Sequence, residues 1–363
     1  MRRFTAVAVG ALTVLALALP AGVLAGAPAD HFAKPFFHVK PNASAAPTGL
    51  SPATIKGAYN FTTSMTAGAG LTIAIVDAYD DPTAESDLNV FSSQYGLPSC
   101  TTANGCFKKV NQTGGASYPK ADAGWALEIS LDVQWAHAIA PGAKILLVEA
   151  RSSSFTNLLA AEDYAAAHAN YVSNSWGAGE FSGETAYDSH FSHSGVSFFV
   201  SAGDAGLPAE YPSASPNVIS VGGTTLHFSS GVLTSETGWT DGGGGCSAYE
   251  SATSAQFGFS GFAQVGCGSF RGTPDVSLDA DPASGVSVYD STRYQRQRGW
   301  WTVGGTSASS PMIAARSAVA GTLVGSAYVY GGGISYRDIT SGNNGAPCLV
   351  GYDLCTGRGS WTN

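Results

Sequence analysis

Short apolar runs separated by segments of helical periodicity are the dominant pattern along this chain. Five runs have the length and composition of buried strands, and they cover residues 71–76, 144–149, 171–175, 196–201 and 218–221. Strands that alternate with helices predict an α/β fold with a mostly parallel central sheet and helices on both faces. In such a sheet, functional residues gather at the carboxyl ends of the strands.

A serine follows two glycines immediately before a predicted helix. Gly304 and Gly305 precede Ser307, and the apolar run that follows reads as a helix entered through Pro311. This pattern would hold Ser307 on a sharp turn at a helix N-terminus, where backbone N–H groups favour a developing negative charge and glycine lets a substrate approach. The alternative is that Thr306 or Ser307 only caps the helix.

Two acidic segments are candidates to complete a site around that serine. Glu128 and Asp132 are four residues apart in the predicted helix 123–137, so they share a face. They are either a coupled carboxyl pair, in which one is a general base and the other holds it, or a solvated stripe. Asp204 directly follows the strand 196–201 and is either a functional carboxyl or an ordinary turn residue. The strand end at 172–177 could pair with an extended peptide.

The N-terminus has the features of an export signal. Arg2 and Arg3 precede an apolar run at 5–19 and small residues that end at Ala25. Because the run is too short to span a membrane comfortably, we expect residues 1–25 to be removed and the protein to be secreted to the extracellular medium without a membrane anchor. The Ala/Pro-rich residues 26–45 are expected to form a flexible lead-in to one domain at 46–363.

Charge and cysteine content narrow the function classes. Removal of Arg2 and Arg3 with the signal leaves 15 of the 17 basic residues against 26 acidic ones, a net charge of −11. Phosphates would be repelled, so nucleic acid is not expected as a partner. Six cysteines in an exported chain predict disulfides, and the lack of CxxC spacing argues against a thiolate metal site. Pairing of neighbours is the simplest connectivity: Cys100 with Cys106, Cys246 with Cys267 and Cys348 with Cys355.

Together these motifs resemble the sedolisin family, the serine-carboxyl peptidases built on a subtilisin-like fold. The resemblance runs from about Pro47 to Gly359 and includes a Glu-x-x-x-Asp helix, an oxyanion segment and a nucleophile turn, here at 128–132, 201–204 and 305–311. It implies that Ser307 attacks the scissile carbonyl, that Glu128 takes its proton, and that Asp132 orients Glu128. Asp204 would stabilise the oxyanion.

The implied roles predict activity in acid. A carboxyl can donate to an oxyanion only while it is protonated, so an ionised Asp204 would repel the charge that it must stabilise. A carboxyl base with a pKa of about 4 to 5 is also suited to acidic solution. We therefore expect a monomeric endopeptidase that hydrolyses peptide bonds of proteins at acidic pH, with polypeptide substrates as its partners.

The C-terminal segment resembles the family's calcium site. One Ca²⁺ would be bound by the carboxylates of Asp338 and Asp353 and by the carbonyls of Ile339, Leu349 and Gly351. Leu349 departs from the usual glycine but keeps its carbonyl, and the alternative is a turn-rich tail without metal. A second departure is that only about 20 residues separate the signal from the predicted domain, whereas the family generally has a long folded prodomain. The activation route is therefore open.

Two other functions fit parts of the sequence. A subtilisin-type Asp-His-Ser peptidase would use Asp77 after the first strand, but none of the seven histidines is followed by Gly-Thr. A catalytically inactive secreted binding protein could keep the fold without the chemistry. Reaction with a serine-directed inhibitor that depends on Ser307 would distinguish an enzyme from such a binding protein.

Overall fold

The computed structural model of the chain describes Met1 and residues 30–362, and its compact unit begins at His31. The predicted signal at 1–25 lies outside the described residues apart from Met1. Among the described residues, no helix is long and apolar enough to cross a membrane. The described part of the predicted lead-in, residues 30–45, differs from the expectation of a flexible segment. It contains the strands β1 (Lys34–Pro35) and β2 (His38–Val39), which pair with the domain.

The main sheet is mostly parallel, as the sequence predicts. Its order is β17-β18-β14-β10-β8-β6-β3-β5-β4, with β11 beside β10. All neighbours from β4 to β18 pair in parallel, and β11 and β17 are antiparallel. The strands are β3 (Thr72–Ala78), β4 (Phe107–Asn111), β5 (Lys144–Ala150), β6 (Tyr171–Asn174), β8 (Ser197–Ser201), β10 (Ile219–Ser229), β11 (Val232–Gly238), β14 (Val276–Asp279), β17 (Tyr336–Arg337) and β18 (Ser360–Trp361).

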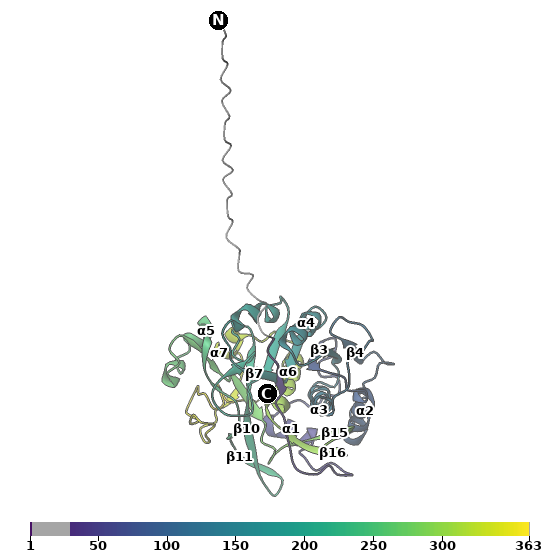
Figure 1. Cartoon of the computed structure of the whole chain (residues 1–363). Coiled ribbons are helices and arrows are strands. Elements are labelled where there is room, and N and C mark those ends of the chain that lie inside the picture. The colour runs from purple at the N-terminus through teal and green to yellow at the C-terminus, as the bar shows by residue number, and fades with distance from the viewer. Residues whose placement is uncertain (2–29, 363) are drawn as a thin grey trace. The chain divides into compact units, whose positions relative to one another are not determined.

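Helices cover both faces of this sheet (Figure 1). Successive side chains of a strand point to opposite faces, and β3 shows the result. Ile73 and Ile75 pack into the core that contains α3 (Ala123–Ile139) and α6 (Thr306–Ala320), whereas Val76 packs into the core with α4 (Phe155–Ala166). The first core also includes α1 (Pro52–Tyr59) and α2 (Ala84–Tyr95), and the second η1 (Glu184–Phe191).

Smaller elements border the sheet and carry the connections. The hairpin of β15 (Val286–Tyr294) and β16 (Gln297–Gly304) leads directly into α6, and β2 pairs with β16. A second small sheet has the order β1-β7-β9, with β7 at Trp176–Gly179 and β9 at Glu210–Tyr211. The remaining elements are β12 (Gly245–Ser251), α5 (Ser254–Phe257), η2 (Phe262–Val265), β13 (Phe270–Thr273) and α7 (Ser326–Tyr330).

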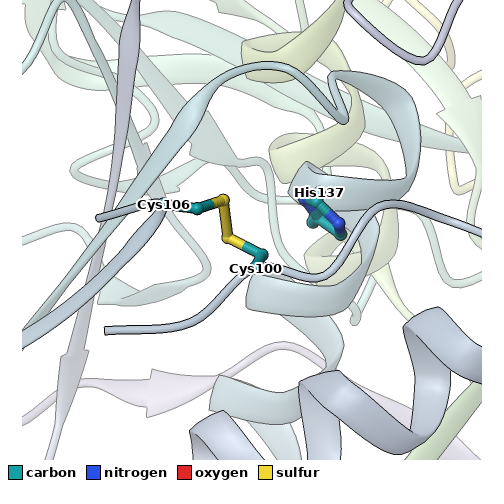
Figure 2. Close-up of side chains that lie close together, drawn as sticks. All are labelled: Cys100, Cys106 and His137. Carbon is teal, nitrogen blue, oxygen red and sulfur yellow. A yellow bond between two sulfur atoms is a disulfide. The ribbon is translucent and has the colours of Figure 1, made fainter. Parts of the chain in front are cut away.

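All six cysteines form the disulfides expected from their spacing. Cys100 pairs with Cys106, Cys246 with Cys267 and Cys348 with Cys355. The first disulfide lies beside His137 of α3 (Figure 2), which makes a hydrogen bond of 2.9 Å between its Nε2 and the carbonyl of Pro98. Since both sulfurs are bonded to each other, they are not available as thiolate ligands for a metal.

Candidate active site

Ser307 lies in the first turn of α6, at the carboxyl end of the central strands. The helix begins at Thr306, before Pro311, and not at the proline as the sequence suggested. Pro311 has no N–H to donate to the carbonyl of Ser307, and that carbonyl instead lies 3.5 Å from the Ser175 hydroxyl. Gly305 is the N-cap residue with φ of +104°, and no side chain caps the helix. The capping interpretation of Thr306 and Ser307 is therefore excluded.

Glu128 and Asp132 come from α3, which packs against α6. Asp122 caps α3 by accepting from the backbone N–H groups of Gly124 and Trp125, and every residue from Trp125 to Ile139 is buried. Both carboxyls are fully buried, which excludes the solvated stripe. Asp132 Oδ1 accepts a hydrogen bond of 2.9 Å from the Ser175 hydroxyl. Ser175 is thus a contact of this site, whereas the sequence analysis considered it only as part of the strand end 172–177 that could pair with a peptide.

The surroundings of Glu128 favour its protonated form. Burial raises the pKa of Glu128 well above its usual value, and the nearby charges of Asp132 and Asp77 raise it further, against a lowering by the Ser307 hydroxyl. Burial also raises the pKa of Asp132, while Ser175 and Glu128 oppose the rise. Neither oxygen of Glu128 has a hydrogen-bond partner among the described residues. The pair therefore shares its protons instead of being doubly ionised at neutral pH.

Asp204 follows β8 and reaches the start of α6. Its Oδ1 accepts from the backbone N–H of Thr306 at 2.8 Å and from the Thr306 hydroxyl at 2.9 Å. Burial raises the pKa of Asp204 to about 8, although the hydrogen bonds from Thr306 oppose this rise. The carboxyl is consequently protonated in neutral and acidic solution, and its Oδ2 has no hydrogen-bond partner among the described residues. Thr306, which sequence reasoning treated only as a possible cap, holds this carboxyl in place.

Asp77 is a further buried carboxyl beside the pair. It lies at the end of β3, and neither of its oxygens has a hydrogen-bond partner in the described part of the chain. Burial raises its pKa well above the usual value, and the charges of Asp132 and Glu149 add to the rise. Its position directly after a buried strand was visible in the sequence, where it was considered only for the Asp-His-Ser alternative.

No histidine serves Ser307 as a base in the described residues. The Ser307 hydroxyl lies 3.3 Å from the carbonyl of Ser175 and 3.2 Å from the amide nitrogen of Phe36, and it makes no hydrogen bond to a histidine ring. His137 is engaged with Pro98 through its Nε2, and the Nε2 of His38 lies 3.4 Å from Asp204. The arrangement thus gives no support to an Asp-His-Ser triad.

Segment 31–40, which the sequence did not link to the site, passes beside Ser307. The backbone N–H of Ser307 donates to the Phe36 carbonyl at 3.0 Å, and the Phe36 N–H lies 3.2 Å from the carbonyl of Ser175. Two adjacent aromatic residues in an otherwise Ala/Pro-rich stretch were the signal that could have found it. A peptide carbonyl therefore lies beside Ser307, the candidate nucleophile.

The five expected calcium ligands lie on two loops that come together. Asp338 Oδ2 accepts from the backbone N–H of Gly351 at 3.0 Å, and Asp353 Oδ2 accepts from that of Leu349 at 2.7 Å. The carbonyl oxygens of Ile339, Leu349 and Gly351 accept no hydrogen bond from the described residues. Two carboxylates and three free carbonyls form an all-oxygen donor set, which fits the preference of Ca²⁺.

Comparisons with known proteins agree with this geometry. A family model described as the subtilase family matches residues 109–326, more than half of the chain. Kumamolisin from Bacillus sp. (strain MN-32) is 32% identical over 87% of this chain and 63% of its own length. Sedolisin from Pseudomonas sp. (strain 101) is 34% identical over 46% of this chain and 33% of its own length. The chain thus spans less than two thirds of these curated relatives.

Solved structures show the same relationship. Pseudomonas sedolisin, a serine-carboxyl proteinase complexed with two molecules of pseudo-iodotyrostatin, aligns with a TM-score of 0.73 and 28% identity, over 87% of this chain and 96% of that one. A lanthipeptide protease shares the fold with a TM-score of 0.55 and 14% identity, over 86% of this chain and 91% of that one. The subtilisin-like α/β fold expected from the sequence is confirmed. The chain therefore belongs to the subtilase family and, within it, to the sedolisin group.

Proposed function

We propose that this chain is a secreted serine-type endopeptidase that hydrolyses peptide bonds of proteins in acidic solution. The observation that carries the proposal is the contact between a peptide carbonyl, that of Phe36, and the N–H of Ser307 at 3.0 Å. Backbone N–H groups at a helix N-terminus stabilise a negative charge that develops on such an oxygen. Polypeptides are accordingly the proposed substrates, and the working unit is a monomer.

In this mechanism the Ser307 hydroxyl attacks the carbonyl carbon and Glu128 takes its proton. Asp132, which is held by Ser175, shares a proton with Glu128 and keeps that carboxyl oriented. The negatively charged oxygen of the tetrahedral intermediate receives hydrogen bonds from the Ser307 N–H and from the protonated Asp204. Glu128 then returns the proton to the leaving amine, and water releases the acyl group.

The pKa values set two limits on activity. The Glu128–Asp132 pair must have lost at least one proton to accept another, so activity increases as pH rises through the first pKa of the pair. Asp204 must be protonated to donate, so activity falls as pH rises through its pKa of about 8. From the usual pKa of a carboxyl, the sequence argument had placed this alkaline limit below neutral pH. Burial of Asp204 therefore widens the pH range in which its carboxyl can donate to the oxyanion.

Calcium has a structural role in this proposal. Asp338, Asp353 and the three carbonyls would hold one Ca²⁺, and the Cys348–Cys355 disulfide closes the loop that carries Asp353. The bound ion would supply charge neutralisation and rigidity to the C-terminal loops, and no step of the reaction depends on it.

The test is hydrolysis of an unfolded protein between about pH 2 and pH 10, a range that includes both limits. The Ser307→Ala variant should lose activity at every pH. The Asp204→Asn variant should lose the fall near pH 8, because an amide donates regardless of pH. Full activity of Ser307→Ala would overturn the proposal, and a folded wild-type chain without activity at any pH would favour the binding-protein alternative.

A further inference from the structure

Two histidines and a carboxyl meet beside α4, on the face of the main sheet opposite α6. His190 lies in the last turn of η1, His193 follows three residues later, and Asp163 lies on α4. The Nδ1 of His190 lies 2.8 Å from Asp163 Oδ1, and the Nε2 of His193 lies 3.9 Å from the same oxygen. One carboxylate oxygen is thus approached by two imidazole nitrogens from another segment of the chain.

The fold fixes the backbone that carries the two histidines. Phe191, which lies between them in the sequence, is 1% exposed and packs into the core that contains α4. The N–H of Val196 donates to the carbonyl of His193 at 3.3 Å, which closes a turn before β8. Surface ion pairs alone contribute little to stability. The histidines are therefore placed beside α4 by the buried aromatic ring and the turn, and not by their own contact with Asp163.

The three side chains remain open to solvent and have no competing cation. Their exposed fractions are 30% for His190, 36% for His193 and 49% for Asp163. Within the described residues, Asp163 forms no salt bridge with a lysine or an arginine. An ion can therefore reach the group from solvent, and the donor atoms that it meets are two imidazole nitrogens and one carboxylate oxygen.

The separations at Asp163 fit a small divalent transition-metal ion. Zn²⁺ binds histidine nitrogen and carboxylate oxygen at about 2.0 to 2.2 Å in a tetrahedral arrangement, so two of its ligand atoms lie about 3.3 Å apart. The observed 2.8 and 3.9 Å lie on either side of this value. The three donor atoms do not all lie within 4.8 Å of one another, so the half-exposed ring of His193 must turn toward His190 as the ion binds.

We propose that His190, His193 and Asp163 bind one Zn²⁺, with water as the fourth ligand. Imidazole nitrogen suits Zn²⁺, whereas Ca²⁺ takes a shell of oxygens, so this site and the C-terminal loops would select different metals. The ion would join α4 to the connection between β7 and β8. Ser175 directly precedes β7 and Asp204 follows β8, so the joint would stabilise a connection between two strands of the active site.

The test measures Zn²⁺ bound by the full chain after removal of metals with a chelator, by equilibrium dialysis at about pH 7.5, where ordinary histidines are mostly neutral. Excess Ca²⁺ is present to fill oxygen sites. Compared with wild type, His190→Ala and Asp163→Asn should each lose one Zn²⁺ per chain or bind it at least about tenfold more weakly. His227→Ala is the matched control, because this exposed histidine contacts Thr237 outside the group and should keep wild-type binding.

The melting temperature gives a second readout that does not depend on activity. Added Zn²⁺ should raise it in wild type, in His227→Ala and in Asp338→Asn, because an ion that binds only the folded state stabilises that state. In His190→Ala the rise should be mostly lost, with the fold of the variant checked by circular dichroism.

Two results would overturn the proposal. Equal Zn²⁺ binding by wild type, His190→Ala and Asp163→Asn would leave only a surface ion pair, and equal losses in His227→Ala would show that binding is unspecific. Zn²⁺ binding by a chain without peptidase activity would support this inference and overturn only the proposed function, because the two use different residues.

Discussion

Two buried groups of carboxyls in this molecule have opposite surroundings. Beside Ser307, Glu128 and Asp77 have no hydrogen-bond partner among the described residues. In the C-terminal loop, Asp353 accepts from the N–H of Leu349 with one oxygen, and from Cys355 and Thr356 with the other. A carboxyl whose oxygens are satisfied by N–H groups holds a loop together, whereas one left without partners costs stability and stays available for reaction. On the proposed function, the carboxyls beside Ser307 serve the chemistry, whereas Asp353 holds the scaffold.

The largest expected effect is the loss of activity when Glu128, which has no hydrogen-bond partner among the described residues, is substituted. Glu128→Gln should lower kcat/KM on the order of 10³-fold, because the amide cannot take the Ser307 proton. The free energy of unfolding should change by less than about 1 kcal/mol, since Glu128 makes no hydrogen bond that the variant would lose. Hydrolysis of an unfolded protein and urea unfolding measure the two quantities.

Glu162 on α4 is the matched control for that variant. It is also fully buried, and burial raises its pKa to about 8, but it contacts Asn174 in the core that contains α4. Glu162→Gln should keep kcat/KM within about twofold, as expected for a residue outside the reacting groups. Equal losses of activity in both variants would show that burial, and not the position beside Ser307, decides the effect.

Much of the scaffold could be predicted from the sequence, because its signals are local. The buried runs at 71–76 and 144–149 became neighbouring parallel strands, since apolar period and length directly specify such strands. The spacing of Glu128 and Asp132 likewise gave their shared helix face. The start of α6 was misplaced because Pro311 looks like a helix entry, whereas the tertiary contact between Ser175 and Ser307 compensates for the missing hydrogen bond.

Features that depend on contacts between residues far apart in the chain could not be predicted from the sequence. The segment around Phe36 has no periodicity, and its position results from pairing with residues 140 or more positions away, at β7 and β16. The raised pKa of Asp204 also depends on burial by several elements, so the usual carboxyl value gave too acidic a limit. The roles of the site residues came from motif resemblance, which does not supply protonation states.

The second prediction concerns stability against pH. Burial raises the pKa of Glu149 to about 9 and those of Glu162 and Asp204 to about 8. Unfolded carboxyls have a pKa of about 4, so between about pH 4 and pH 9 the folded state binds more protons than the unfolded state. The contribution of these carboxyls to the free energy of unfolding should therefore be fully present below about pH 4. It should fall as pH rises, by about 1.4 kcal/mol per pH unit for each group between its unfolded and folded pKa values.

Thermal unfolding between about pH 3 and pH 9 tests this slope. Glu162→Gln removes one raised group, so its melting temperature should depend less on pH than that of wild type. A melting temperature that increases from acid to neutral pH would contradict the assignment of these buried carboxyls as protonated.

The third prediction sharpens the role of the C-terminal loop. Asp353→Ala removes the acceptor of four hydrogen bonds, which leaves buried N–H groups unpaired. The free energy of unfolding in calcium-free solution should fall by about 2 to 4 kcal/mol. Activity per folded molecule should stay near wild type, in contrast to Glu128→Gln. A loss of activity without a loss of stability would reverse the assignment of the two groups.

The smallest expected effect separates the metal from the hydrogen bonds of the same loop. Asp338 is exposed, and among the described residues it accepts only from Gly351, so Asp338→Asn should cost little in calcium-free solution. In wild type, added Ca²⁺ should raise the melting temperature by about 2 to 6 °C, because an ion that binds only the folded state stabilises it. Asp338→Asn should lose most of this rise, whereas Asp241→Asn, at an exposed carboxyl outside the ligand set, should keep it. If Ca²⁺ raised the melting temperature equally in all three proteins, the ion would bind elsewhere, and the loop would be held by Asp353 and the Cys348–Cys355 disulfide alone.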